Sequence, residues 1–301
     1  MRTLNRILTI SDPGFSIYCE GNHKLTACGV FSSGIYFEDA QGRVLMLYDQ
    51  SYGCLPFGLA GTEINGNAKT LKILPGTEMI LDNKRLIRED GSLFALISYC
   101  PYSPARPVLP AREGIRFLQS SGKAFLSATG RSSLAVYSGM DCASIKKNEV
   151  EDIFARTGYA GIQRLEYGLH SANASELSAG LDMVLGLGRG LTPSFDDFLT
   201  GLMSALNFCG REWGLEIPAK GIISALLQEK ATKKTNKYSA AYLLASAAGG
   251  RFSAVEDVLA LAGGKSWSAA AEKLTLIGGS SGADMLAGVV FTARVINNMP
   301  V

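Results

Sequence analysis

The sequence has little of what metal clusters, membrane spans or secretion signals require. It contains two histidines and six cysteines, and no two cysteines form a CxxC pair, so a zinc cluster is not expected. The cysteines stand among apolar residues, which is typical of reduced thiols in a cytosolic protein. No apolar run approaches the roughly 20 residues of a membrane helix, and the opening MRTLNRILTI lacks the apolar region and cleavage site of a signal peptide. We therefore expect a soluble cytoplasmic protein that does not enter a membrane.

Net charge is also nearly absent. The 29 basic and 27 acidic residues leave a formal charge of +2, which is too small to attract nucleic acid, so no nucleic-acid partner is expected. What the chain does have is 47% apolar residues and 34 glycines. A length of 301 residues with this composition predicts a globular protein of about two domains.

Residues 1–100 have the pattern of short strands. Their apolar segments are rich in β-branched and aromatic residues and are separated by Gly, Asn or Asp. Because parallel strands need long crossovers, such close spacing predicts an antiparallel β-rich domain, either a small sandwich or a barrel-like sheet. The predicted strands are 15–20, 25–31, 34–40, 43–49 and 93–100.

A connector with four prolines follows at 101–114, and it marks the predicted boundary because proline continues neither a ladder nor a helix. Residues 115–301 are predicted to form a mainly helical domain, so the fold class is α+β. Segment 111–122 reads as a helix, while 124–130 and 132–139 fit either strands or a helical pair. Several later helical patterns end in a glycine pair, which suits a helix C-terminus.

The motif GLGRGLTPSFDD, at 186–197, leads into a helix whose apolar residues form one stripe from Phe195 to Leu206. Thr192 can cap this helix with Pro193 in its first turn, or Ser194 can cap it with Asp197 three residues later. A glycine-rich entry leaves backbone N–H groups aimed at one point, which favours an anion. Arg189 adds a planar fork for carboxylate or phosphate. The motif is not a Walker loop, because the Lys-Ser/Thr ending is missing, and it is not a dinucleotide fingerprint, because no βαβ pattern precedes it.

A second copy of this helix start occurs at 281–293. Ser281 matches Ser194, Asp284 matches Asp197, and a glycine run again precedes the helix. The mid-helix glycines of the two copies would let the helices approach closely. We expect the two starts to converge on one pocket that offers amides, hydroxyls and three carboxylates. The residues of this predicted site are Gly186, Gly188, Arg189, Gly190, Thr192, Ser194, Ser280, Ser281 and Gly282 for binding, and Asp196, Asp197 and Asp284 for catalysis.

Carboxylates beside an anion site have three explanations. A Mg²⁺ could bridge them to the substrate, one could serve as a general base with a raised pKa, or they could bind backbone N–H groups as caps. Asp197 and Asp284 suit the capping role. In the second copy Ala283 stands at the position equivalent to Asp196, so a ligand or catalytic role suits Asp196 better.

The stretch GLGRGLTPSFDDFLTGLMSAL resembles the signature GLGxGLTPSGDDFLxGL of the AllH family, and YSAAYLLASAAGGRFS with IGGSSGADMLAGVV is similar to the family's downstream pattern. This resemblance covers about 181–295. It implies a subunit of an oxamate carbamoyltransferase that converts oxalurate and phosphate to oxamate and carbamoyl phosphate in allantoin (purine) degradation. It also implies partner subunits of the AllF/FdrA and AllG type, with a carbamate kinase acting next.

Two departures from the family pattern bear on the site. Arg189 stands where the family usually has Pro, and Phe195 stands where it has Gly, so Phe195 is expected to narrow or cover the pocket. For a carbamoyl transfer between small anions we hypothesise an anion cradle of Arg189 and the GLGRG amides, with Asp196 or Asp197 as base. A Mg²⁺-dependent hydrolase and a non-catalytic scaffold subunit are the alternatives, and the sequence requires no cofactor.

Overall fold

The computed structural model describes residues 6–10, 21–31, 34–61, 64, 71–82, 84–99, 102–139 and 144–299. The strand predicted at 15–20 lies outside these residues. The chain divides into two compact units. The first comprises 1–103 with 250–253, and the second comprises 104–249 with 254–301.

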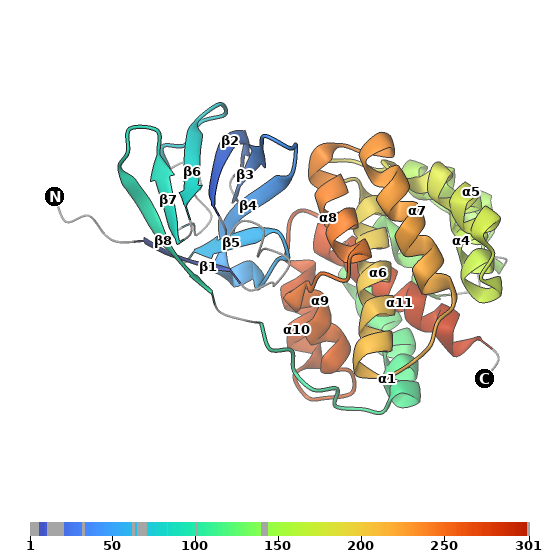
Figure 1. The fold of residues 1–301 in the computed structure, drawn as a ribbon. Coiled ribbons are helices and arrows are strands. Elements are labelled where there is room, and N and C mark those ends of the chain that lie inside the picture. The colour runs from blue at the N-terminus through green and yellow to red at the C-terminus, as the bar shows by residue number, and fades with distance from the viewer. Residues whose placement is uncertain are drawn as a thin grey trace. The chain divides into compact units, whose positions relative to one another are not determined.

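The first unit is a closed barrel with the strand order β1-β5-β4-β3-β2-β6-β7-β8 (Figure 1). Its interior is filled by apolar side chains from every described strand, including Leu25, Phe37 and Leu47, each with no exposed surface. The predicted strands 25–31, 34–40, 43–49 and 93–100 correspond to β2, β3, β4 and β8. The strands are β1 (Arg6–Ile10), β2 (Asn22–Val30), β3 (Gly34–Asp39), β4 (Val44–Asp49), β5 (Gly58–Gly61), β6 (Glu78–Asp82), β7 (Arg85–Arg88) and β8 (Leu93–Tyr99).

The expectation of purely antiparallel pairing is wrong at two places in the barrel. β4 pairs with β5 in parallel, and β1 pairs with β8 in parallel, whereas the other neighbours are antiparallel. The β4–β5 connection is short, but it contains a 3₁₀ turn, η2 (Gln50–Tyr52), that Asp49 caps by accepting from the Ser51 N–H. Closure of the barrel by β1 then joins strands far apart in the sequence, which local spacing does not reveal.

The second unit is helical throughout its regular structure, so the α+β fold class is confirmed. Segment 111–129 is one helical stretch in which α1 and α2 flank a π-helical segment, η5 (Leu118–Gly122). The two segments left open are also helical. The helices are α1 (Ala111–Phe117), α2 (Lys123–Thr129), α3 (Val136–Gly139), α4 (Ile153–Ser171), α5 (Ala174–Val184), α6 (Ser194–Glu212), α7 (Ala219–Lys234), α8 (Lys237–Ala247), α9 (Ser253–Ala260), α10 (Trp267–Thr275) and α11 (Ser281–Asn297).

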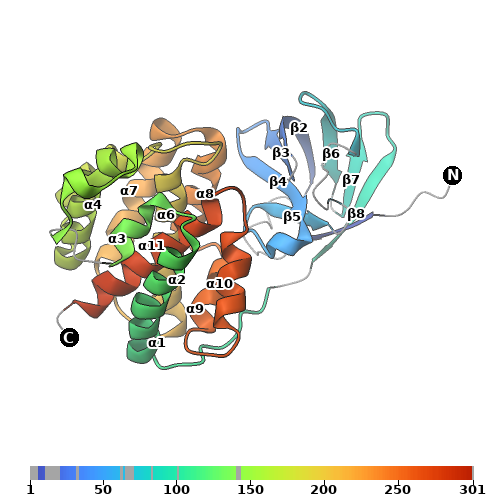
Figure 2. The same ribbon diagram turned by 180° about the vertical axis from the view of Figure 1, so that it is seen from behind.

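Helices α6 and α11 form the centre of this unit (Figures 1 and 2). Both are buried along most of their length. α8 packs on α6, α7 joins α8 to the α4–α5 pair, and α1, α2, α3 and α10 pack on α11. Among the described helices, none is both long and apolar enough to cross a membrane.

Candidate functional site at the paired helix starts

The two copies of the repeat pack on each other with an approximate two-fold relation. A Cβ added to Gly201 would collide with the carbonyl oxygen of Met285, and one added to Gly288 would collide with that of Phe198. Met285 and Phe198 are themselves equivalent positions of the repeat. The glycines therefore let the backbones of α6 and α11 touch, as the sequence predicts, and this contact fixes the two helix starts side by side.

Neither predicted side-chain cap forms at α6. The helix begins at Ser194 after Pro193, and neither Thr192 nor Ser194 caps it. Instead the glycine-rich loop folds back, so that the Phe195 N–H donates to the Leu187 carbonyl at 3.1 Å. α11 is entered in the same way, with the Gly282 N–H donating to the Ile277 carbonyl at 3.0 Å.

Hydroxyl groups join the two starts across the repeat. The Thr192 and Ser281 hydroxyl oxygens lie 3.0 Å apart, and the Thr192 hydroxyl donates to Asp197 Oδ2 at 2.9 Å. Ser281 also hydrogen-bonds the Asp197 carboxyl, while Ser194 on α6 interacts with Asp284 on α11. Each helix start thus supplies a hydroxyl to the carboxyl group of the other start, and the two acids concerned, Asp197 and Asp284, are both buried.

The surroundings of Asp284 differ from those of Asp197. The Ser132 hydroxyl donates to Asp284 Oδ1 at 2.5 Å, and Ser280 and Ser194 are its other hydroxyl neighbours. Asp284 Oδ2 has no hydrogen-bond partner among the described residues, although the side chain is 1% exposed. Ser132 also caps the short helix η6 (Ser133–Ala135), and no local sequence pattern marks it as a partner of Asp284.

Asp196 has a different set of partners. Its Oδ1 accepts from the Gly186 N–H at 2.8 Å, and its Oδ2 accepts from Thr235 at 2.5 Å and Ser239 at 2.7 Å. Asp196 therefore ties the glycine-rich loop to the junction of α7 and α8. Thr235 and Ser239 were not predicted, because nothing in their local sequence marks them as partners of a residue some 40 positions away.

Burial shifts the titration of all three acids. Burial raises the pKa of Asp196, although its three hydrogen bonds, from Gly186, Thr235 and Ser239, lower it. Burial raises the pKa of Asp197 well above the ordinary range, although the hydrogen bonds from Ser281 and Thr192 lower it. The nearby charges of Asp284 and Asp196 raise this pKa further. Burial also raises the pKa of Asp284 to about 6 despite the Ser132, Ser280 and Ser194 hydroxyls. Both acids between the helix starts thus favour the protonated form far more than a free carboxyl group does.

The side chains at the two departures from the family signature have different surroundings. Phe195 has no exposed surface, and its ring packs on Gly158 of α4 and beside Tyr137 and Phe198. The expectation that it covers the site is therefore wrong, because the ring turns into the core. Arg189 is exposed, and its guanidinium lies 5.4 Å from the centroid of the Phe154 ring.

The glycine-rich loop keeps donors available. Gly186, Gly188 and Gly190 adopt positive φ values of 75°, 140° and 89°. From Gly188 to Thr192, no backbone N–H donates to another described residue. Consecutive unbonded amides in such a conformation can hold a small anion.

No group of three or more His, Cys, Asp or Glu side chains among the described residues is arranged to hold a metal ion. The bridging Mg²⁺ explanation thus gains no support from the three acids. His170 lies in the last turn of α4.

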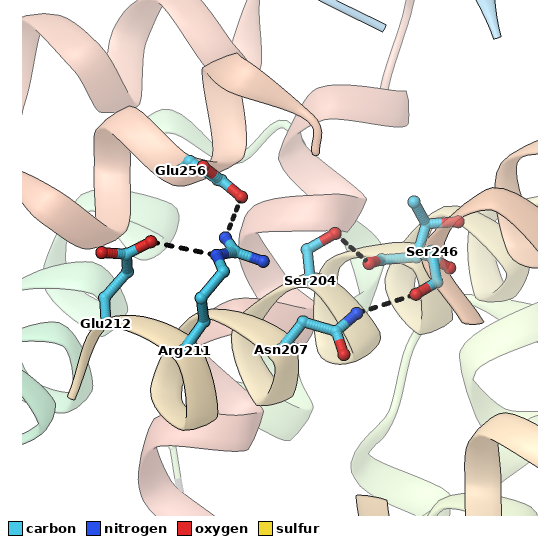
Figure 3. A network of polar contacts seen from close by, with 7 residues as sticks. Ser204, Asn207, Arg211, Glu212, Ser246 and Glu256 are labelled. Atoms are coloured by element: carbon cyan, nitrogen blue, oxygen red, sulfur yellow. Dashed lines mark hydrogen bonds and ion pairs between the residues drawn. The ribbon is translucent and has the colours of Figure 1, made fainter. Parts of the chain in front are cut away.

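A second polar network holds the far half of α6 and was not predicted (Figure 3). Asn207 donates to the Ser246 carbonyl of α8 at 2.8 Å, and Arg211 pairs with Glu212 at 2.9 Å and with the buried Glu256 of α9. Polar contacts therefore fix α6 against its neighbours at both ends.

Residues 184–293 match the family model of the oxamate carbamoyltransferase subunit AllH. The matched segment contains both helix starts, so it confirms the resemblance carried by their motifs. No curated protein and no solved structure matches the chain.

Proposed function

We propose, from the match of residues 184–293 to the family model of the oxamate carbamoyltransferase subunit AllH, that this chain works in carbamoyl transfer between oxalurate and phosphate. The products are oxamate and carbamoyl phosphate, and the setting is allantoin degradation. Its partners are subunits of the AllF/FdrA and AllG type. All four reactants are small anions, which suits the unbonded amides from Gly188 to Thr192.

The observation that carries the proposal is the cluster of hydroxyls above Asp197 and Asp284. Thr192, Ser194 and Ser281 are half-buried, so they reach solvent, whereas both acids are at most 2% exposed. A bound substrate would meet the hydroxyls first, and the hydroxyls connect it to the acids. Carboxyl groups of raised pKa in such a position are typical of catalytic sites.

The reaction needs one proton at the leaving nitrogen. A phosphate oxygen bonds to the carbamoyl carbon, and the bond from that carbon to the oxamate nitrogen breaks. In this step Asp197 is the proton donor, because burial raises its pKa well above the ordinary value and so favours its protonated form. The Thr192 hydroxyl, 2.9 Å from Asp197 Oδ2, gives its proton to the nitrogen and takes the acid's proton. The proton of hydrogen phosphate restores Asp197, so atoms and charge balance.

The test is phosphorolysis of oxalurate by the chain assembled with its partner subunits. Asp197→Asn and Thr192→Val should each lower kcat by about 10²–10⁴-fold, which is the usual contribution of general acid catalysis. Glu229→Gln, at an exposed site on α7, is the control and should keep the full rate. Thermal denaturation of each variant checks that the fold is intact.

One observation favours a second candidate, a scaffold subunit whose partner carries out the chemistry. The three motif acids are buried, and Asp196 has both oxygens engaged by the protein itself. In that case Asp197→Asn and Thr192→Val would leave kcat unchanged in the assembled enzyme. The same assay therefore decides between the two.

A further inference from the structure

One hydroxyl at the site comes from outside the two helix starts and outside the segment that matches the family model. Ser132 lies between α2 and η6 and is 6% exposed. Its Oγ accepts the Leu134 N–H at 3.1 Å, and its hydroxyl donates to Asp284 Oδ1 at 2.5 Å. The preceding residue, Arg131, donates to the Thr275 carbonyl at the end of α10 at 3.1 Å. Ser132 is therefore held in place as a donor to a buried acid.

The hydroxyls around Asp197 bring fewer protons than there are contacts to fill. Asp197, Thr192 and Ser281 make three polar contacts among themselves. The two hydroxyls carry one proton each, and each proton serves one of these contacts. The third contact becomes a hydrogen bond when the Asp197 carboxyl group is itself protonated and donates. This arrangement therefore favours a proton on Asp197.

The hydroxyls around Asp284 give the opposite result. Ser132, Ser194 and Ser280 are its three hydroxyl neighbours, and each carries a proton of its own. Hydroxyl donors stabilise the ionised form of a carboxyl group. Asp284 therefore suits the negative charge. Because the charge of Asp284 acts on Asp197, ionisation of one acid opposes ionisation of the other.

We propose that Ser132 is a positioning residue that keeps the negative charge of the acid pair on Asp284 and the remaining proton on Asp197. This assignment rests on the proposed function, in which Asp197 supplies the proton for the leaving nitrogen. Ser132 acts through Asp284, whose charge holds the proton on Asp197. The effects on the pKa values point the same way: the charge of Asp284 raises the pKa of Asp197, and the Ser132 hydroxyl lowers that of Asp284.

The other charged groups around the pair were compared element by element. Asp196 on α6 raises the pKa of Asp197, and Asp152 before α4 raises that of Asp284, so these two act in opposite directions on the difference. The charged side chains of α1, α2 and α10 are exposed, and His170 lies at the opposite end of α4 from Asp152. The arginines of the adjoining segments bind backbone carbonyls or other acids, and these are Arg131, Arg156, Arg164, Arg211 and Arg294.

The test is carbon-13 NMR of the aspartate carboxyl groups in the full-length chain, with Asp197→Asn and Asp284→Asn to assign the two signals. In the wild type, Asp284 should ionise at the lower pH and Asp197 at the higher. Ser132→Ala removes one donor to a charged group, so the two midpoints should approach each other by about one pH unit. Ser132→Thr keeps the hydroxyl and should keep the wild-type separation. Ser138→Ala, which removes a buried hydroxyl that donates to the Ala135 carbonyl, is the matched control.

Turnover of oxalurate by the assembled enzyme is the second readout. Ser132→Ala should lower kcat by up to about tenfold, because a smaller share of the molecules holds the proton on Asp197. KM for oxalurate should stay unchanged, since the variant alters the acid pair and not the anion-binding loop. Ser132→Thr should restore kcat, and Ser138→Ala should keep the wild-type value.

The outcomes separate this inference from the proposed function. Asp197 ionising before Asp284 in the wild type overturns the inference, and so does an unchanged separation of the midpoints in folded Ser132→Ala. The titrations need no substrate. An assembled wild-type enzyme that fails to cleave oxalurate with phosphate, while its acids titrate in the expected order, contradicts the proposed function and supports the charge distribution.

Discussion

At the scale of single residues, Asp284 links the stability of the helical unit to pH. Its folded pKa of about 6 lies above the ordinary 3.8, so the folded state holds the proton more tightly than the unfolded state. The resulting stability is complete below about pH 4 and is lost as pH rises through 6. Its size is roughly 3 kcal/mol, from a shift of about two units.

Asp284→Asn should therefore gain stability relative to wild type between pH 3.5 and 7, by roughly that amount. Urea denaturation at several pH values measures the difference. Glu229→Gln, an exposed acid, should track the wild type across the same range. If Asp284→Asn also tracks the wild type, then Asp284 titrates normally in the folded protein.

Asp196 should contribute to stability through its three donors. Asp196→Ala leaves the Gly186 N–H and the Thr235 and Ser239 hydroxyls without their acceptor, which should lower the free energy of unfolding by roughly 2–4 kcal/mol. Denaturant titration measures this loss. Asp182→Ala, which removes an exposed acid paired with Lys230, should cost no more than about 1 kcal/mol. An Asp196→Ala protein that stays stable but loses turnover would assign Asp196 to the substrate instead.

The sequence identified these acids without revealing their partners. In the sequence, Asp197 alone suffices for the capping role, so the adjacent Asp196 is interpreted as a ligand or catalytic residue. Its actual donors lie at the start of the glycine-rich loop and around the start of α8. Hydrogen bonds between segments distant in sequence depend on tertiary packing, and a local pattern does not encode them.

At the scale of elements, the crossing of α6 and α11 depends on Gly201 and Gly288. An Ala at either position forces its Cβ into a backbone carbonyl of the partner helix, and backbone cannot move aside as a flexible side chain can. Gly201→Ala and Gly288→Ala should each destabilise by about 3 kcal/mol or more, at the upper end of overpacking. Thermal and urea denaturation measure the effect.

Gly221 provides the matched control in α7. A Cβ there has no atom within 4 Å, so Gly221→Ala should be neutral or should stabilise by up to about 1 kcal/mol through helix propensity. Equal effects at Gly201 and Gly221 would mean that α6 and α11 do not touch at the glycine.

The repeat is the part of the site that sequence reasoning captured best. Matching cap, acid and glycine positions predicted that the two helix starts meet, and Thr192 and Ser281 do lie in contact. The form of capping was not captured, because the Leu187 carbonyl replaces the expected side-chain caps. A loop that accepts the hydrogen bond with a backbone carbonyl has no residue-type signature, since every residue has a carbonyl group.

At the scale of the whole molecule, the barrel marks the limit of sequence reasoning. Alternating apolar residues indicated β2, β3, β4 and β8, but the short β5 and β7 carry too few residues for a clear period. The parallel pairing of β1 with β8 is set by barrel closure over some 90 positions. Fold class was therefore predictable, whereas strand order was not.

The division into two compact units predicts two unfolding transitions, because each unit buries a core of its own. Both tryptophans, Trp213 and Trp267, belong to the helical unit, so their fluorescence reports that unit alone. Far-ultraviolet circular dichroism reports both units. The fluorescence and dichroism transitions of the wild type should therefore fail to coincide in urea.

Two variants assign the transitions. Leu47→Ala opens the barrel core and should cost about 2–5 kcal/mol, shifting only the transition that fluorescence does not see. Gly201→Ala should shift the fluorescence transition and leave the other in place. If each variant moved both signals together, the two units would unfold as one cooperative body. The pH dependence assigned to Asp284 would then appear in the barrel signal too, whereas independent units confine it to the tryptophan signal.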